Sequence, residues 1–193
     1  MHSIDRKYVM QKLLSIAVIV LLTSCMPVWI TDYLEPSASE GALREMCAGP
    51  PEWIEFDRNH VKIWVNAARS NNPDNLLVSI YIFIPKGTSV EIPNKEVAAL
   101  ITGEGSRYAG ILKYQSELTQ EPLVGETIHM NPIIGERWDR SKDYMAFANI
   151  NIPKSDHYEL ILPPFRINNI SVSWPKIVLK KKTHMSVAVP INC

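Results

Sequence analysis

Short apolar runs alternate with polar turn residues along the chain from Trp53 onwards. In residues 60–67 (HVKIWVNA) apolar side chains stand at every second position, the spacing that places them on one face of a β-strand. Residues 53–56 (WIEF) precede them across the polar turn 57–59 (DRN), so the two runs predict a hairpin. Residues 76–85 (LLVSIYIFIP) are apolar on both faces, which is typical of a central strand.

The same criteria predict further strands at 89–92, 96–102, 107–115, 126–131, 144–152, 157–165, 170–181 and 184–191. About ten short strands, separated by turn signals every eight to twelve residues, predict an all-β fold. The expected architecture is an immunoglobulin-like or related antiparallel β-sandwich, or a partly closed barrel. The 14 prolines agree with this class, because proline interrupts helices.

Residues 26–52 have no long periodic pattern and mix Pro, Ser and Gly with scattered charges. We interpret this stretch as part of a flexible N-terminal tether. Within it, Ser39 can cap a short helical turn over 39–46. The predicted organisation is therefore a leader at 1–24, a tether at 25–52 and a β-sandwich domain at 53–193.

The leader has the pattern of an export signal. Arg6, Lys7 and Lys12 make its start positive, and a largely apolar run of ten residues follows at 13–22. Crossing a bilayer as a helix takes roughly 20 apolar residues. We therefore expect the run to be cleaved rather than to span the membrane.

The leader ends in Leu22, Thr23, Ser24 and Cys25, which resemble the lipobox of bacterial lipoproteins. The resemblance implies that Cys25 is acylated and becomes the mature N-terminus, with this covalent lipid and no other cofactor. Met26 stands where an aspartate favours the inner membrane in that class, which implies the outer membrane, facing the periplasm; the inner membrane is the alternative. The other interpretations are an ordinary secretory signal with a chance cysteine and an uncleaved anchor.

The charge of the mature chain excludes one class of partner. The leader carries three of the 20 basic and one of the 20 acidic residues, so 17 basic and 19 acidic residues follow it. Nucleic-acid binding needs a concentration of Lys and Arg. We expect no nucleic-acid partner.

Two cysteines are left once Cys25 is assigned to lipid. Cys47 and Cys193 form an even pair in an oxidising compartment, which predicts a disulfide. That bridge would close a loop across nearly the whole mature domain. Free or intermolecular thiols are the alternative.

Residue patterns typical of catalysis or metal binding do not occur. Ser106 in residues 103–110 (GEGSRYAG) lacks the spacing of a nucleophile elbow, and the segment predicts a glycine-rich turn between two strands. The histidines His60, His129, His157 and His184 each stand alone in their own segments, so we expect no metal site. We predict that the protein is not an enzyme.

Two loops are candidates for binding a partner. Residues 135–143 (GERWDRSKD) place Trp138 between charges, and Arg137, Trp138, Asp139 and Arg140 have the character of a protein interface. The alternative is that Trp138 anchors the loop into the core. Residues 70–75 (SNNPDN) form the second loop.

The chain has one run of basic residues, Lys180, Lys181 and Lys182. These lysines either contact anionic lipid head groups or form a solvated strand end that discourages edge pairing.

A tyrosine stands at the start of one predicted strand. The order Ser155 to Tyr158 before an apolar run resembles the tyrosine corner of immunoglobulin-like sandwiches, in which the Tyr hydroxyl bonds back to nearby backbone.

In size, lipid anchor, β-rich domain and lack of catalytic residues the chain resembles lipid-anchored immunity proteins that neutralise type VI secretion effectors, such as phospholipases. The resemblance implies a periplasm-facing binding module, held at the membrane by its lipid, with a protein toxin as partner. A structural or assembly lipoprotein of a cell-envelope complex is the alternative. A lipid-anchored hydrolase with a non-standard site is the third interpretation.

Overall fold

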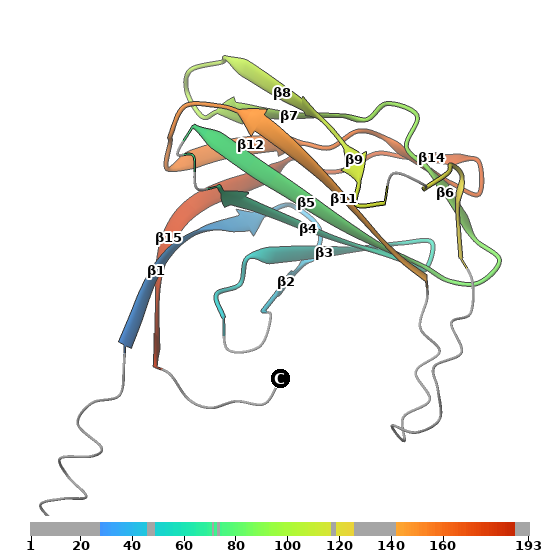
Figure 1. The fold of residues 1–193 in the computed structure, drawn as a ribbon, viewed down its shortest axis with the longest axis horizontal. Coiled ribbons are helices and arrows are strands. Elements are labelled where there is room, and N and C mark those ends of the chain that lie inside the picture. The colour runs from blue at the N-terminus through green and yellow to red at the C-terminus, as the bar shows by residue number, and fades with distance from the viewer. Residues whose placement is uncertain are drawn as a thin grey trace, which may run out of the picture.

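The computed structural model describes residues 28–45, 49–70, 72, 74–116, 119–125 and 142–187 of the 193-residue chain. Every regular element within these residues is a β-strand. The strands form three sheets in which all pairs are antiparallel (Figure 1). The described part of the chain holds no helix long and apolar enough to cross a membrane.

Each of the three sheets combines strands from distant parts of the chain. From one edge to the other, the five-stranded sheet contains β1 (Val28–Ser37), β15 (Ile177–Val187), β12 (His157–Ile161), β7 (Glu96–Ile101) and β8 (Arg107–Ile111). The strand order of the six-stranded sheet is β2 (Ala42–Arg44), β3 (Trp53–Arg58), β4 (Val61–Arg69), β5 (Asn75–Ile84), β11 (Lys142–Asn151) and β9 (Lys113–Tyr114). The four-stranded sheet contains β10 (Leu123–Val124), β6 (Ser89–Glu91), β13 (Phe165–Ile167) and β14 (Ile170–Val172).

One hydrophobic core joins the inner faces of the sheets. Ile63 and Ile80 from the six-stranded sheet, Leu160 and Leu179 from the five-stranded sheet, and Phe165 from the smallest sheet are all buried in it. Burial of such a side chain stabilises the fold by about 1.5–3 kcal/mol. The predicted all-β antiparallel sandwich is confirmed.

Several individual strands agree with the sequence pattern. β3 and β4 form the predicted hairpin, and β5 lies between β4 and β11 as the predicted central strand. The segment 103–110 contains the predicted glycine turn, in which Gly103 and Gly105 have positive φ. The strand predicted at 107–115 is instead divided: β8 and β9 belong to different sheets.

The predicted tether is wrong where β1 and β2 form. β1 and β2 both lie within residues 26–52, and β1 pairs with β15 over ten residue pairs. The helical turn predicted over 39–46 is also wrong, because β2 occupies Ala42–Arg44. The described fold therefore already includes strands at residues 28–44, ahead of the boundary predicted at residue 53.

The turn between β3 and β4 gives a stability prediction. Arg58 pairs with Val61, and the two residues between them, Asn59 and His60, have φ of 51° and 65°. Both values belong to the type I′ turn of two-residue hairpins, a conformation that Asn tolerates and β-branched residues do not. We expect His60→Val to lower the free energy of unfolding by about 1 kcal/mol, measured by urea denaturation. His60→Asn is the control and should leave it unchanged or raise it; equal losses in both variants would contradict the turn assignment.

Candidate functional site

A buried tyrosine fixes the corner between β11 and β12. Tyr158 is fully buried, and its hydroxyl donates a hydrogen bond to the Pro153 carbonyl at 3.0 Å and accepts one from the Ser155 N–H. The bond to backbone five residues upstream confirms the predicted tyrosine corner. Arg69, at the end of β4, makes further contacts with the same corner. Its guanidinium lies 4.9 Å from the centre of the Tyr158 ring and donates to the carbonyls of Ile152 and Pro153 at 3.2 and 3.0 Å.

A cavity of about 410 Å³ opens beside this corner. β1, β4, β15 and the corner segment supply its walls. The lining residues are Asp32, Tyr33, Leu34, Glu52, Ala67, Ala68, Arg69, Ser70, Lys154, Ser155 and Lys181. The volume lies in the range of small-ligand pockets, and apolar residues of β1 and β4 face charged groups of both signs.

The charges of β1 and β15 in this cavity are paired. Lys181 Nζ lies 2.9 Å from Asp32 Oδ2, and Thr183 Oγ1 donates to Asp32 Oδ1 at 2.8 Å. The hydrogen bonds from Lys181 and Thr183 lower the pKa of Asp32, and the bond to Asp32 raises the pKa of Lys181. Burial, together with the hydrogen bond that its hydroxyl donates to Glu35, raises the pKa of Tyr33 to about 12. Tyr33 is therefore protonated at neutral pH.

The two serines of the cavity stabilise turns. Ser70 Oγ donates to the Asn72 carbonyl at 3.2 Å and accepts from the Asn72 N–H at 3.1 Å. Ser155 Oγ makes the same pair of bonds with the backbone of His157. Within the described residues, the hydrogen bonds of both hydroxyls go to this local backbone rather than to a histidine side chain.

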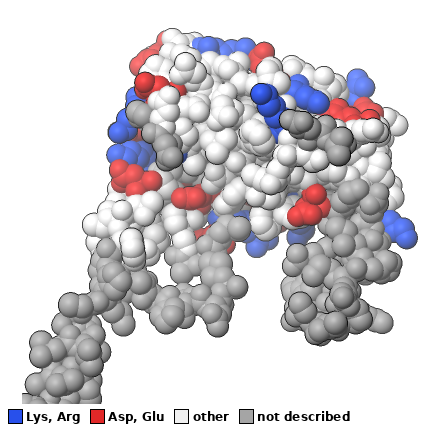
Figure 2. Space-filling view, viewed as in Figure 1, with Lys and Arg blue, Asp and Glu red and all other residues white. Residues whose placement is uncertain are grey.

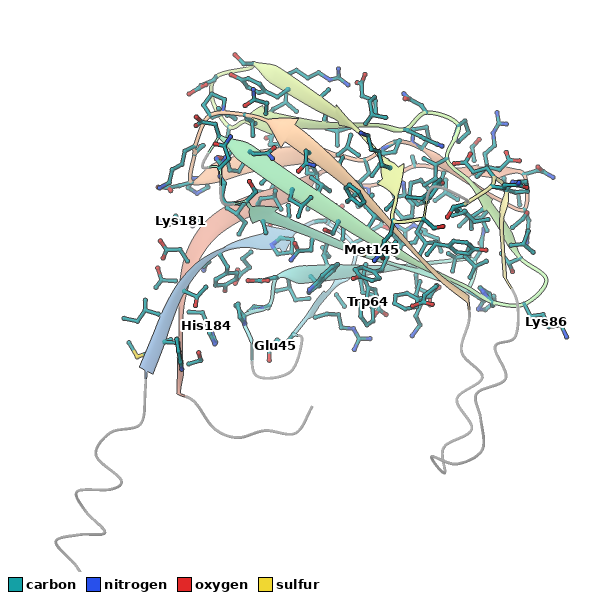
Figure 3. All side chains as sticks on the ribbon, viewed as in Figure 1. Glu45, Trp64, Lys86, Met145, Lys181 and His184 are labelled. Atoms are coloured by element: carbon teal, nitrogen blue, oxygen red, sulfur yellow. The ribbon has the colours of Figure 1, made fainter. Side chains whose placement is uncertain are left out.

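The outer side of the six-stranded sheet carries a cluster of rings that we call the aromatic face: Trp53, Trp64, Tyr81 and Phe83. The ring centres lie 5.2 Å apart for Trp53 and Tyr81 and 4.8 Å apart for Trp64 and Phe83. All four side chains are partly exposed, whereas their neighbours along each strand point into the core. Trp64 and Tyr81 are paired across β4 and β5, and Met145 of β11 extends the row (Figure 3).

A charge network borders the aromatic face. The Glu55 carboxylate lies 2.7 Å from Arg44 Nε and 3.8 Å from Lys62 Nζ, and its side chain is 10% exposed. Burial by itself raises the pKa of Glu55, but Arg44 and then Lys62 outweigh that effect, so the pKa lies below its ordinary value. Arg44 and Lys62 are half exposed and can meet a partner's surface.

The lowered pKa of Glu55 predicts how stability depends on pH. Because the folded pKa is below the unfolded one, the stabilising contribution is fully present above the unfolded pKa and is lost as the pH falls through the folded pKa. We expect wild-type chain to lose more free energy of unfolding than Glu55→Gln between about pH 5 and about pH 3. The exposed Glu104→Gln variant should follow the wild type. If the free energy of unfolding falls by the same amount in wild type and Glu55→Gln over this pH range, the charge network is contradicted.

The structure describes only some of the residues predicted from the sequence to have a role. Cys25, Cys47, Cys193 and the group Arg137, Trp138, Asp139 and Arg140 lie outside the described residues. Of the loop at 70–75, Ser70 lines the cavity. His129 is also outside, and the described residues contain no group of three or more His, Cys, Asp or Glu side chains placed to hold a metal.

The sequence pattern missed two features that the structure shows. β1 supplies Asp32, Tyr33 and Leu34 to the cavity, yet its segment has the composition of a tether. Half of the aromatic face has a signal in the sequence, because Trp53 and Trp64 stand between the alternating core positions of the predicted hairpin. No protein-family model and no curated protein matches the chain.

Proposed function

We propose that this chain is a periplasm-facing membrane lipoprotein that binds a protein partner and acts as an immunity protein. Its partner is an antibacterial toxin, for example a phospholipase effector of a type VI secretion system. The observation that carries the proposal is the aromatic face with its charged border. The lipid on Cys25 holds this surface at the outer membrane.

The composition of the aromatic face favours a protein as its occupant. Trp, Tyr and Arg dominate the binding energy of protein interfaces, and Trp53, Trp64, Tyr81 and Arg44 gather on one side of one sheet. The rings stand on adjacent paired strands and pack against one another, which restricts their movement. A rigid ring costs little conformational entropy when a partner covers it.

Membrane attachment adds to the proposed inhibition. A toxin that attacks lipids from the periplasm acts at the membrane surface, where a tethered inhibitor is concentrated. Confinement to that surface raises the effective concentration of the inhibitor without any new contact.

The proposal is tested in a strain that lacks the gene. We expect the deletion strain to be killed by its own parent in contact-dependent competition, and the full-length gene to restore survival. The double variant Trp64→Ala and Tyr81→Ala should fail to restore it, because truncating interface aromatics costs on the order of 2–4 kcal/mol of binding each. Ile170→Ala is the control and should protect fully, because Ile170 is an exposed apolar residue at the start of β14, in a different sheet from the aromatic face. A deletion strain with unchanged survival would contradict the proposal.

A further inference from the structure

The outer end of the β1–β15 ribbon leaves the body of the sandwich. The pairing of β15 with β12 runs from Ile177 to Lys180 and ends there, whereas its pairing with β1 continues to Val187. Over residues 28–31 and 184–187 the two strands are paired only with each other within the described part of the chain. Figure 1 shows this end of β1 and β15 extending beyond the rest of the fold.

The ribbon tip, residues 28–30 with 185–187, exposes large apolar side chains on both faces. Ile30 and Met185 are opposite each other and are 66% and 67% exposed; Trp29 points to the other face and is 60% exposed. Each is more exposed than most apolar residues of the described chain. An isolated two-stranded ribbon is marginally stable in water. The tip therefore gains stability when something apolar covers it.

Charged residues begin directly behind the tip. Asp32 is paired with Lys181, and Glu35 Oε1 lies 3.8 Å from Lys182 Nζ. Figure 2 shows this band of red and blue atoms at the left of the molecule, with white atoms below it where the ribbon ends. Lys181 and His184, labelled in Figure 3, mark the change along β15 from the charged band towards the tip.

The sequence before β1 identifies what covers the tip. Only Met26 and Pro27 separate Cys25 from Val28, and three residues span at most about 10 Å. Acyl chains on Cys25 that enter a bilayer therefore bring the tip to the membrane surface. A long tether would leave the tip free, but β1 begins too early for one.

We propose that the ribbon tip inserts into the head-group region of the membrane that holds the lipid anchor, with Trp29, Ile30 and Met185 in contact with lipid. The inference rests on the proposed acylation of Cys25. Three residues of strand span about 10 Å, which matches the depth to which interfacial segments enter a bilayer. Tryptophan favours this region because its ring is apolar and its N–H is polar.

This arrangement orients the domain. The charged band would lie at the level of the head groups, where ion pairs remain hydrated. Asp32 and Lys181 of that band line the cavity, so the cavity would open close to the membrane surface. The ribbon would act as a stiff support in place of a flexible tether.

Fluorescence quenching tests the insertion on the full-length lipidated chain, reconstituted in phosphatidylethanolamine and phosphatidylglycerol vesicles. Lipids with brominated acyl chains quench tryptophan inside the bilayer, and iodide quenches it in water. We expect bromolipid quenching in the wild type and loss of most of it in Trp29→Phe. Trp53→Phe, the matched control from the aromatic face, should keep the wild-type quenching. The double variant Ile30→Asn and Met185→Asn, which retains Trp29, should also lose most of it.

Three results would overturn the inference. Iodide reaching Trp29 without bromolipid quenching would place the tip in water, and protection of Trp29 from both quenchers would mean that a second copy or another protein covers it. Absence of acyl label on the chain would remove the anchor and the proposed membrane location together. The first two results leave the immunity function intact, because the competition experiment scores it separately.

Discussion

Replacing Gly110 with alanine is expected to destabilise the domain by about 3 kcal/mol, the upper part of the range for overpacked core positions. A Cβ at Gly110 would lie 2.4 Å from the Asn149 carbonyl oxygen and 3.1 Å from Ile150 Cγ1. The oxygen belongs to the backbone of β11, so β8 and β11 would have to separate to admit one methyl group. Guanidinium denaturation measures the loss.

Gly103→Ala is the comparison for this variant. A Cβ there meets nothing within 4 Å, but the φ of +92° is unfavourable for alanine. We expect a loss of about 1–2 kcal/mol from conformation alone. If Gly103→Ala proves more destabilising than Gly110→Ala, the close approach of β8 and β11 is contradicted.

Replacing Cys25 with serine is expected to release the protein from the membrane and to abolish protection in competition. Each buried acyl methylene contributes about 0.8 kcal/mol to membrane binding, and two or more chains hold a protein stably. Among the described side chains of the ribbon tip, Trp29, Ile30 and Met185 are the well-exposed apolar ones, and we expect them not to replace the lipid. Palmitate labelling and fractionation of outer and inner membranes measure the result. Cys47→Ser is the control and should keep the label; membrane retention of the serine variant at the wild-type level would contradict the lipobox assignment.

Local signals in the sequence predict the local features of the fold. The β3–β4 hairpin and the central strand β5 follow from period-two alternation and from apolar character on both faces. The tyrosine corner is predictable because Tyr158 and its backbone partners Pro153 and Ser155 lie within five residues. Neither inference needs a distant part of the chain.

β1 escapes prediction because its partner lies far away in sequence. Its apolar alternation is interrupted by Asp32 and Glu35, which look like solvated charges in isolation. Both carboxylates meet lysines of β15, about 150 residues later in the chain. The pairing becomes visible only once β1 and β15 are side by side.

The lysine run is difficult to interpret for the same reason. The interpretation of Lys180, Lys181 and Lys182 as a solvated strand end is wrong, because all three lie within β15 and β1 pairs along the whole run. Lys181 and Lys182 stand opposite Leu34 and Tyr33 and neutralise carboxylates of β1. Contact of this run with anionic head groups stays a prediction.

The aromatic face is only partly predictable. The alternation of β3 and β4 shows that Trp53 and Trp64 point away from the core, but β5 is apolar on both faces, so its sequence does not show which way Tyr81 and Phe83 point. Their assembly into one cluster depends on the register between strands, which the turn at Asn59 and His60 sets for β3 and β4. The loop at 137–140 is the more visible candidate in the sequence, because its residues are adjacent in the chain.

The most direct test of a membrane-held binding module is affinity purification of the full-length chain from solubilised membranes of toxin-producing cells, compared with the Trp64→Ala and Tyr81→Ala double variant. We predict that wild type retains one secreted toxin and that the double variant, equally folded and equally lipidated, loses it. Retention of the same proteins by both chains would contradict binding through the aromatic face. A stable complex of several envelope proteins with no toxin would contradict the immunity function and favour an assembly role.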